Sequence, residues 1–213
     1  SDSTMRGMKH FYEALSQVKT MKRPVRIAYF GDSFIEADIF TADLRERLQQ
    51  EFGGCGVGYV PVTSSISGYR PTVRHTFGGW SSHSSNDSVG FDKMQQDISG
   101  HYFYPREGAY VQLKGQHKYA SRLDTCEIST FYFLNKGFAA VRSKVNNAAE
   151  GELHEEVGTG GMQAVSVKGR IGQVRWSVEQ ADSATFYGVA MDGRQGISLD
   201  NFSVRGSSGL HLR

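Results

Sequence analysis

The fold is decided by the stretch VRIAYFGDS at residues 25–33. Its first six residues form a short apolar run rich in β-branched and aromatic side chains, which indicates a buried strand. Gly31, Asp32 and Ser33 follow at once and predict a tight turn. A strand that runs directly into a polar turn is the usual start of an α/β unit.

A helix is predicted next, over residues 41–52. The Thr41 hydroxyl can cap its first turn, Leu44, Leu48 and Phe52 recur on one face, and the glycine pair 53–54 ends it. Residues 25–54 thus predict strand, turn and helix, which is half of a doubly wound α/β unit.

The flanking segments extend this unit. Before Pro24, residues 3–21 carry apolar side chains at intervals of three and four, which predicts an amphipathic helix. Near the other end, residues 196–204 predict a second buried strand, followed by a glycine-rich turn at 205–209. The α/β unit is therefore expected to resume there.

The region between these segments has a different pattern. From about residue 68 to 192, short apolar segments alternate with polar residues and are separated by Gly, Asn and Ser, with no helical period. Such spacing predicts an antiparallel β-sandwich or jelly roll. We predict an α/β portion at 1–67, an inserted β-module at 68–194, and a return to the α/β portion at 195–213.

Composition narrows the function classes. Lys+Arg 24 against Asp+Glu 22 leaves a net charge of +2, which argues against a nucleic-acid partner held by bulk charge. No apolar run has the length of a membrane span. The chain lacks an initiator Met and a basic-then-apolar leader, so any signal peptide is expected to have been removed or to lie outside this sequence.

Cys55 and Cys126 lack metal-ligand spacing and fit either one disulfide or two buried thiols.

Ser33 is the candidate nucleophile. A sharp turn between a strand and a helix exposes a serine hydroxyl, and free amides nearby can stabilise an oxyanion. The alternative is that Gly31-Asp32-Ser33 is only a polar turn, with Asp32 in a structural role. Glu36 and Asp38 are close enough in sequence to line a pocket, but no role is assigned to them.

The longer context resembles a known family. Residues 25–38, VRIAYFGDSFIEAD, followed by FTADLRERLQ at 40–49 and GGCGVGYV at 53–60, resemble the first block of the SGNH, or GDSL, hydrolases. More narrowly, the chain resembles the bacterial peptidoglycan O-acetylesterase branch, in which a jelly roll like that of carbohydrate-binding modules is inserted after the serine block.

This resemblance implies an α/β fold, namely a doubly wound, three-layer SGNH sandwich that is incomplete in this chain and carries an inserted all-β jelly roll. It implies that Ser33 is the nucleophile and that the backbone amides of Ser33 and Gly206 are oxyanion donors. The implied partner is a glycan, the implied location is periplasmic or extracellular, and neither a metal nor an organic cofactor is required.

The chain departs from the family pattern in its catalytic base. SGNH enzymes also use a third-block Asn and a late Asp-x-x-His, and neither occurs downstream of Gly206. We therefore expect a further C-terminal segment of the same protein. Among the 7 histidines, His211 follows the second block most closely, although a residue at a frayed chain end is the alternative.

Two further residues are candidate sugar contacts. His75 and His83 flank Trp80 in a segment with enough aromatic and polar groups to contact a sugar, so Trp80 and His83 are the predicted substrate-binding residues. A core position for Trp80 is the alternative. The acidic cluster around His154 is expected to be solvated surface rather than a metal site, and the glycosylation-like triplets at Asn86 and Asn201 carry little weight.

Three functions follow from the sequence. The leading one is a serine esterase that removes acetyl groups from a glycan such as peptidoglycan. The second is a non-catalytic glycan-binding protein that uses its β-module. The third is an α/β protein in which Ser33 lies in an ordinary turn.

Overall fold

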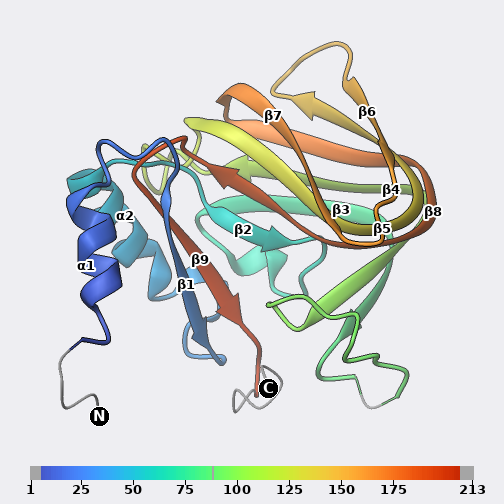
Figure 1. The fold of residues 1–213 in the computed structure, drawn as a ribbon, viewed down its shortest axis with the longest axis horizontal. Coiled ribbons are helices and arrows are strands. Elements are labelled where there is room, and N and C mark those ends of the chain that lie inside the picture. The colour runs from blue at the N-terminus through green and yellow to red at the C-terminus, as the bar shows by residue number, and fades with distance from the viewer. Residues whose placement is uncertain (1–5, 88, 207–213) are drawn as a thin grey trace.

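The computed structural model describes residues 6–87 and 89–206. Figure 1 shows the chain as two helices, a pair of parallel strands beside them, and a large antiparallel β-structure on the other side of that pair. The strand pair therefore lies between the helices and the β-module.

The parallel pair joins the two distant parts of the α/β portion. Strand β1 (Val25–Gly31) pairs with β9 (Ile197–Ser203) in register from Val25↔Ile197 to Gly31↔Ser203. This pairing places residues 197–203 beside residues 25–31. Because the strands are parallel and in register, the turns that follow them leave the sheet at the same edge.

Helices α1 (Lys9–Ser16) and α2 (Thr41–Phe52) cover one face of this pair. A small core forms there around Val18, Val25 and Ile197, with Leu48 and Phe52 of α2 packed against it. Helix α1 is shorter than the predicted 3–21, since its regular turns end at Ser16, and residues 1–5 lie outside the described part. The predicted span of α2 is confirmed, and Gly53 ends it with φ of 79°.

The Thr41 cap is a wrong prediction. Phe40 occupies the N-cap position of α2, with no side-chain cap hydrogen bond. The Thr41 hydroxyl instead donates to Asp38 Oδ1 at 3.0 Å. The Thr41 hydroxyl thus binds a buried carboxylate and does not cap the first turn of the helix.

The β-module is a seven-stranded antiparallel structure with the central order β3-β4-β8-β5-β6. Strands β5 (Cys126–Val145) and β8 (Gln173–Asp192) are long and pair along most of their length. Strand β7 (Met162–Ile171) pairs with the first half of β5, and β6 (Glu152–Val157) pairs with the second half. The long strands therefore belong to two layers, which gives a β-sandwich (Figure 1).

The remaining strands complete the layers. Strand β3 (Val73–Ser84) pairs with β4 (His101–Gly115), and β4 pairs in turn with β8. Strand β2 (Gly58–Pro61) pairs with the end of β8, so the pairing of the sandwich begins about ten residues before the expected boundary at 68. Short 3₁₀ turns lie at η1 (Glu36–Asp38) and η2 (Ser67–Tyr69).

The core of the sandwich is aromatic. Trp176 and four phenylalanines, Phe103, Phe131, Phe133 and Phe186, are fully buried. The Trp176 indole N–H donates to Ser129 Oγ at 3.1 Å, which satisfies its one polar group. Buried and more exposed residues alternate over parts of these strands, such as residues 109–115 of β4, whereas residues 184–192 of β8 are buried without a break.

Polar contacts hold the sandwich to the parallel pair. Arg26 Nη1 of β1 lies 2.7 Å from Asp200 Oδ1 of β9, and its Nη2 donates to Asp192 at the end of β8. Asp200 Oδ1 also accepts the Tyr59 amide of β2 at 2.7 Å. Because both aspartates are almost fully buried, this network fixes the two parts against each other.

Cys55 and Cys126 are both free and buried. The interaction between the two side chains lowers the pKa of Cys55 and raises the pKa of Cys126, so the two thiols lie near each other. Neither helix in the described part of the chain has the length and hydropathy to cross a membrane.

Candidate functional site

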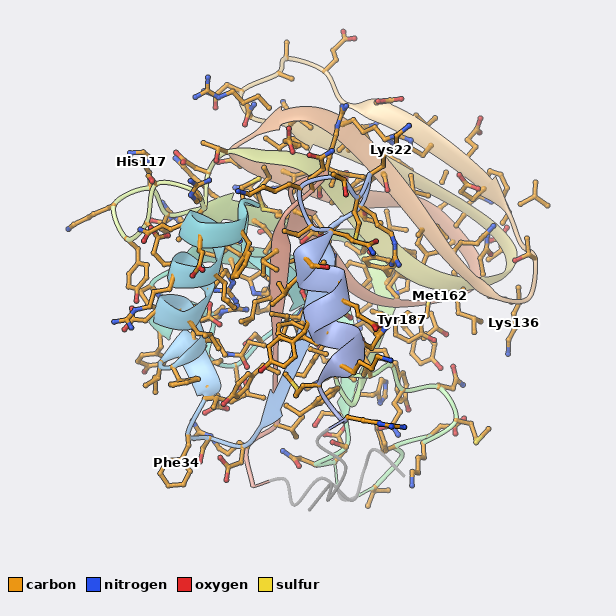
Figure 2. The ribbon with its side chains drawn as sticks, turned by 60° about the vertical axis from the view of Figure 1, so that its left-hand side comes forward. Lys22, Phe34, His117, Lys136, Met162 and Tyr187 are labelled. Atoms are coloured by element: carbon orange, nitrogen blue, oxygen red, sulfur yellow. The ribbon has the colours of Figure 1, made fainter. Side chains whose placement is uncertain are left out.

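Ser33 lies in the turn that follows β1. The Asp32 carboxylate shapes this turn, because its Oδ1 accepts the Phe34 amide at 3.0 Å. Ser33 is exposed, and no described residue hydrogen bonds to its hydroxyl. Figure 2 shows the neighbouring Phe34 side chain at the edge of the molecule, directed away from it. The turn therefore presents Ser33 to solvent, as a nucleophile requires.

Asp38 anchors the segment that follows Ser33. Its side chain is fully buried, and Asn201 Nδ2 donates to its Oδ1 at 2.9 Å. Arg70 Nη2 lies 2.9 Å from Oδ2 and Arg45 Nη1 lies 3.4 Å from it. Thr72 donates to the same oxygen. Four segments of the chain thus meet at one carboxylate.

The electrostatics of this network favour an ionised Asp38. Burial by itself would raise the pKa of Asp38, but the charges of Arg70 and Arg45 outweigh it and hold that pKa far below its usual value. Ala37 and Asp38 adopt left-handed backbone angles, with φ of 56° and 61°. Such angles are costly for residues other than glycine, so the network must hold the loop in this conformation.

Gly206 lies in the turn that follows β9. Its φ of 70° is left-handed, which glycine adopts without strain. A Cβ at this position would meet no heavy atom of the described residues within 4 Å. Because Gly31 of β1 is in register with Ser203 of β9, the turns that carry Ser33 and Gly206 leave the same edge of the parallel pair.

Two contacts hold these turns together. The Val204 amide donates to the Gly31 carbonyl at 3.0 Å. Arg205 Nε and Nη2 donate to Glu36 Oε2 at 3.0 and 2.6 Å, which joins the loop after β9 to the loop after β1. Glu36, which had no assigned role in the sequence, thus bridges the two segments that carry the predicted oxyanion donors.

A cavity of about 300 Å³ lies beside these turns, between the α/β portion and the sandwich. The loops after β1 and β9 supply Glu36, Ala37, Ser203, Val204 and Arg205 to its wall. The sandwich supplies polar groups from the β3–β4 hairpin, namely Ser82, Ser84, Asn86 and His101. Ser33 and Gly206 do not line this cavity, so they lie beside it.

The predicted sugar contacts lie elsewhere on the hairpin. Trp80 packs against the sandwich core, edge-on to Phe186 with ring centroids 5.4 Å apart, and its Nε1 donates to the Tyr110 carbonyl at 2.8 Å. These are contacts of a core residue. The His83 ring stacks on Tyr102 at 4.7 Å and stays partly exposed. Sugar binding by Trp80 and His83 stays a prediction.

No described histidine hydrogen bonds to Ser33. His75 is buried and contacts the Val62 carbonyl at 3.0 Å, and burial lowers its pKa to about 4. His154 contacts Ser143 at 2.9 Å, and His117 pairs with Asp124 at 3.0 Å. Among the histidines that the structure describes, His101 lines the cavity. His211 lies outside the described residues, as do the last residues of the predicted glycine-rich turn.

Sequence reasoning missed the role of Asn201. Its buried amide group donates to the Ile35 carbonyl at 2.8 Å as well as to Asp38. A polar residue within the apolar run of β9 was the available signal, because buried amides need partners. No cluster of three or more metal-ligating side chains occurs among the residues that the structure describes.

A solved structure entitled "Peptidoglycan O-acetylesterase in action, 5 min" matches the chain with a TM-score of 0.70 and 18% sequence identity, over 92% of this chain and 51% of that chain. The chain has the fold of part of that O-acetylesterase. It spans about half the length of the O-acetylesterase chain.

Two carbohydrate-binding modules also match, more weakly. A family 29 module matches with a TM-score of 0.37 and 12% identity, over 65% of this chain and 89% of the module. A family 35 module from Clostridium thermocellum matches with a TM-score of 0.37 and 11% identity, over 63% of this chain and 96% of the module. No protein-family model matches the chain, and no curated protein matches it at a significant level.

Proposed function

We propose that this chain is the serine-bearing part of an SGNH-type esterase that removes O-acetyl groups from a glycan. The observation that carries the proposal is the placement of Ser33 and Gly206 in adjacent turns at the carboxyl edge of the β1–β9 pair. Ligands of open α/β sheets bind outside this edge. The similarity in fold to the O-acetylesterase supports the same reaction class.

The proposed reaction has two steps. Ser33 Oγ attacks the acetyl carbonyl while a base takes its proton, and the amides of Ser33 and Gly206 stabilise the oxyanion. Collapse of this intermediate breaks the bond to the sugar oxygen, which leaves with a proton as a free hydroxyl. Water then attacks the acetyl-serine, and acetate is released.

The base is proposed to come from the rest of the hydrolase. No described residue hydrogen bonds to the Ser33 hydroxyl, and the chain spans about half of the similar enzyme. Strand β1 pairs only with β9 in the described part, so its other edge is open to a further strand of a three-layer SGNH domain. Phe34 and Ile39, in the segment that follows β1, are 85% and 71% exposed, as expected of side chains that another segment covers.

The polar cavity is the proposed glycan site. Its walls combine carboxylate, guanidinium, hydroxyl and amide groups, which can hydrogen bond to sugar hydroxyls. Because the β3–β4 hairpin forms one wall, the β-module contributes directly to substrate binding in this proposal. Glycans of this kind lie outside the cytoplasm, so the proposal includes a periplasmic or extracellular location.

A single comparison tests the proposal. The full-length protein is incubated with O-acetylated peptidoglycan, and released acetate is measured for wild type, Ser33→Ala and Ser121→Ala. Ser121 is an exposed serine on the loop before β5 and serves as the matched control. The proposal predicts loss of acetate release in Ser33→Ala alone, whereas equal activity in all three proteins would overturn it.

Because no residue in the described part of the chain hydrogen bonds to the Ser33 hydroxyl, a second candidate is a glycan-binding protein without catalysis. This candidate predicts that the full-length wild type binds the glycan and releases no acetate. The same assay, read together with a pull-down on insoluble peptidoglycan, separates the two functions.

A further inference from the structure

The outer face of the β3-β4-β8-β5 layer is strongly basic. Val111, Leu113 and Trp176 point into the core, so the residues that alternate with them point outward. The strand register then places five cations on the outer side, which we call the basic face: Arg74, Lys114, Arg142, Lys144 and Arg175.

Two pairs of these cations lie directly opposite each other. Arg74 of β3 is in register with Lys114 of β4, and Arg175 of β8 is in register with Lys144 of β5. Like charges that face each other across strands destabilise a sheet. This repulsion lowers the stability of the free protein, and an anion that binds between the charges relieves it.

Few protein groups neutralise the basic face. Glu179 pairs with Arg142 at 2.9 Å, and Lys144 Nζ donates to the Ala149 carbonyl at 3.1 Å. In the part of the chain that the structure describes, Arg74 and Lys114 make no ion pair, and both are exposed. The positive charge of this face is therefore open to a partner in solution.

Neutral hydrogen-bonding groups lie between the cations. Gln112 is in register with Arg175, and Gln173 is in register with Lys114. Strands about 4.8 Å apart, with same-face residues about 6.8 Å apart along each strand, distribute these amides and charges as a regular array. Such an array suits an extended polymer that carries both hydroxyls and negative charges.

The side chains of the face decide between classes of polyanion. Single-stranded nucleic acids need exposed aromatic rings for base stacking, but the Arg175 guanidinium lies over the Tyr110 ring at 3.6 Å from its centroid. Membrane surfaces need a broad exposed apolar surface. At the β6 edge the exposed Leu153 and Val157 are separated by Glu155 on the same side of the strand, so no such surface is formed by these described residues. The chemistry fits a glycan better than either.

We propose that the basic face binds an acidic polysaccharide, a glycan chain whose sugars carry carboxylates. This site lies on the outer surface of the sandwich, apart from Ser33, and its binding requires no catalysis. The inference therefore goes beyond the proposed esterase function and stands or falls separately from it.

The test uses polygalacturonate and its fully methyl-esterified form, which share one backbone and differ in charge. Binding of the full-length protein is measured by titration calorimetry. We expect polygalacturonate to bind at least about tenfold more tightly than the ester at low salt, and this difference to shrink as salt screens the charges. Equal affinity for the two polymers would overturn the proposal.

Two double variants locate the site. Arg74→Gln with Lys114→Gln removes two charges from the basic face, while Lys168→Gln with Arg170→Gln removes two exposed charges from β7. We expect the first pair to weaken polygalacturonate binding at least about fivefold without lowering the melting temperature, because the repulsion is removed. The second pair should leave the affinity for polygalacturonate unchanged. An equal loss of affinity in both double variants would show that net charge alone attracts the polymer, and would overturn the basic face as its site.

Two further measurements complete the test. Ser33→Ala should bind polygalacturonate as the wild type does, so failure of the esterase proposal would not be mistaken for failure of this one. Poly(A) and phosphatidylglycerol vesicles should bind more weakly than polygalacturonate. Tighter binding of either would overturn the choice of a glycan.

Discussion

The amide of Asn201 on β9 donates to the carboxylate of Asp38 at 2.9 Å. This contact joins the loop that carries Ser33 to the strand that leads to Gly206. Because Asp38 also holds Arg45 and Arg70, one buried charge network determines how the two turns of the candidate site are placed. Most of our predictions concern this network or the turns that it positions.

Replacing Asp38 should strongly destabilise the protein. In Asp38→Asn the two arginines that face it remain buried without a counter-charge, and breaking a buried pair in this way costs about 3–5 kcal/mol. Urea denaturation measures this loss. Asp43→Asn is the matched control, because Asp43 on α2 accepts a bond from the exposed Tyr119 and should cost less than about 1 kcal/mol. Similar losses in both variants would contradict a special role for Asp38.

His75 should make stability depend on pH. Burial lowers its pKa to about 4, below the ordinary value of 6.5, so the folded protein favours the neutral ring. The contribution of His75 to the free energy of unfolding is therefore fully present above pH 6.5 and is lost as pH falls toward 4. The shift corresponds to about 3 kcal/mol.

Urea denaturation at several pH values should show this loss in wild type and a smaller one in His75→Gln. Parallel pH profiles for the two proteins would mean that other groups govern acid stability.

Gly206→Ala should reduce activity through the backbone. A Cβ at this site meets none of the described residues within 4 Å, but φ of 70° is unfavourable for alanine by about 1 kcal/mol, so the turn and its amide should shift. We expect the kcat for acetate release from full-length enzyme to fall about tenfold or more, with a smaller change in KM. Gly206→Asn should retain more activity, because Asn tolerates this conformation. Equal kcat in Gly206→Ala and wild type would remove the Gly206 amide from the mechanism.

Trp80 should act on stability more than on glycan binding. Trp80→Phe keeps a ring against Phe186 and loses the 2.8 Å bond to the Tyr110 carbonyl, which should cost about 1–3 kcal/mol. Glycan affinity, measured at a temperature where both proteins are folded, should stay unchanged. A large loss of affinity with unchanged stability would instead establish Trp80 as a sugar contact.

The spacing of apolar residues along the chain predicted the helices and strands whose pattern is visible within one short segment. The apolar run at 25–30 and the spacing of Leu44, Leu48 and Phe52 predicted where β1 and α2 lie. Burial differs from that expectation, because Val25 is the buried residue of β1 and the buried residues of α2 are Thr41, Ala42, Arg45 and Gln49. Strand β2 was not predicted, because a four-residue strand carries too little pattern to show that it is a strand or which sheet it joins.

The Asp38 network was not predictable from the sequence. Its partners Arg70 and Asn201 lie 32 and 163 residues away along the chain, and no spacing rule links them. The Asp38 network also explains the Thr41 hydroxyl, which binds Asp38 in place of a helix amide. The buried Asp38 carboxylate needs hydrogen-bond partners, and this need outweighs the preference of a nearby hydroxyl for the helix backbone.

The most direct test of the central claim is covalent labelling of Ser33. The full-length protein is treated with a fluorophosphonate, digested, and examined by mass spectrometry, with Ser33→Ala as control. We expect one adduct on the peptide that contains Ser33, and none in the variant. A folded wild-type protein that takes no label, or takes it at another serine, would contradict the claim that Ser33 is the nucleophile.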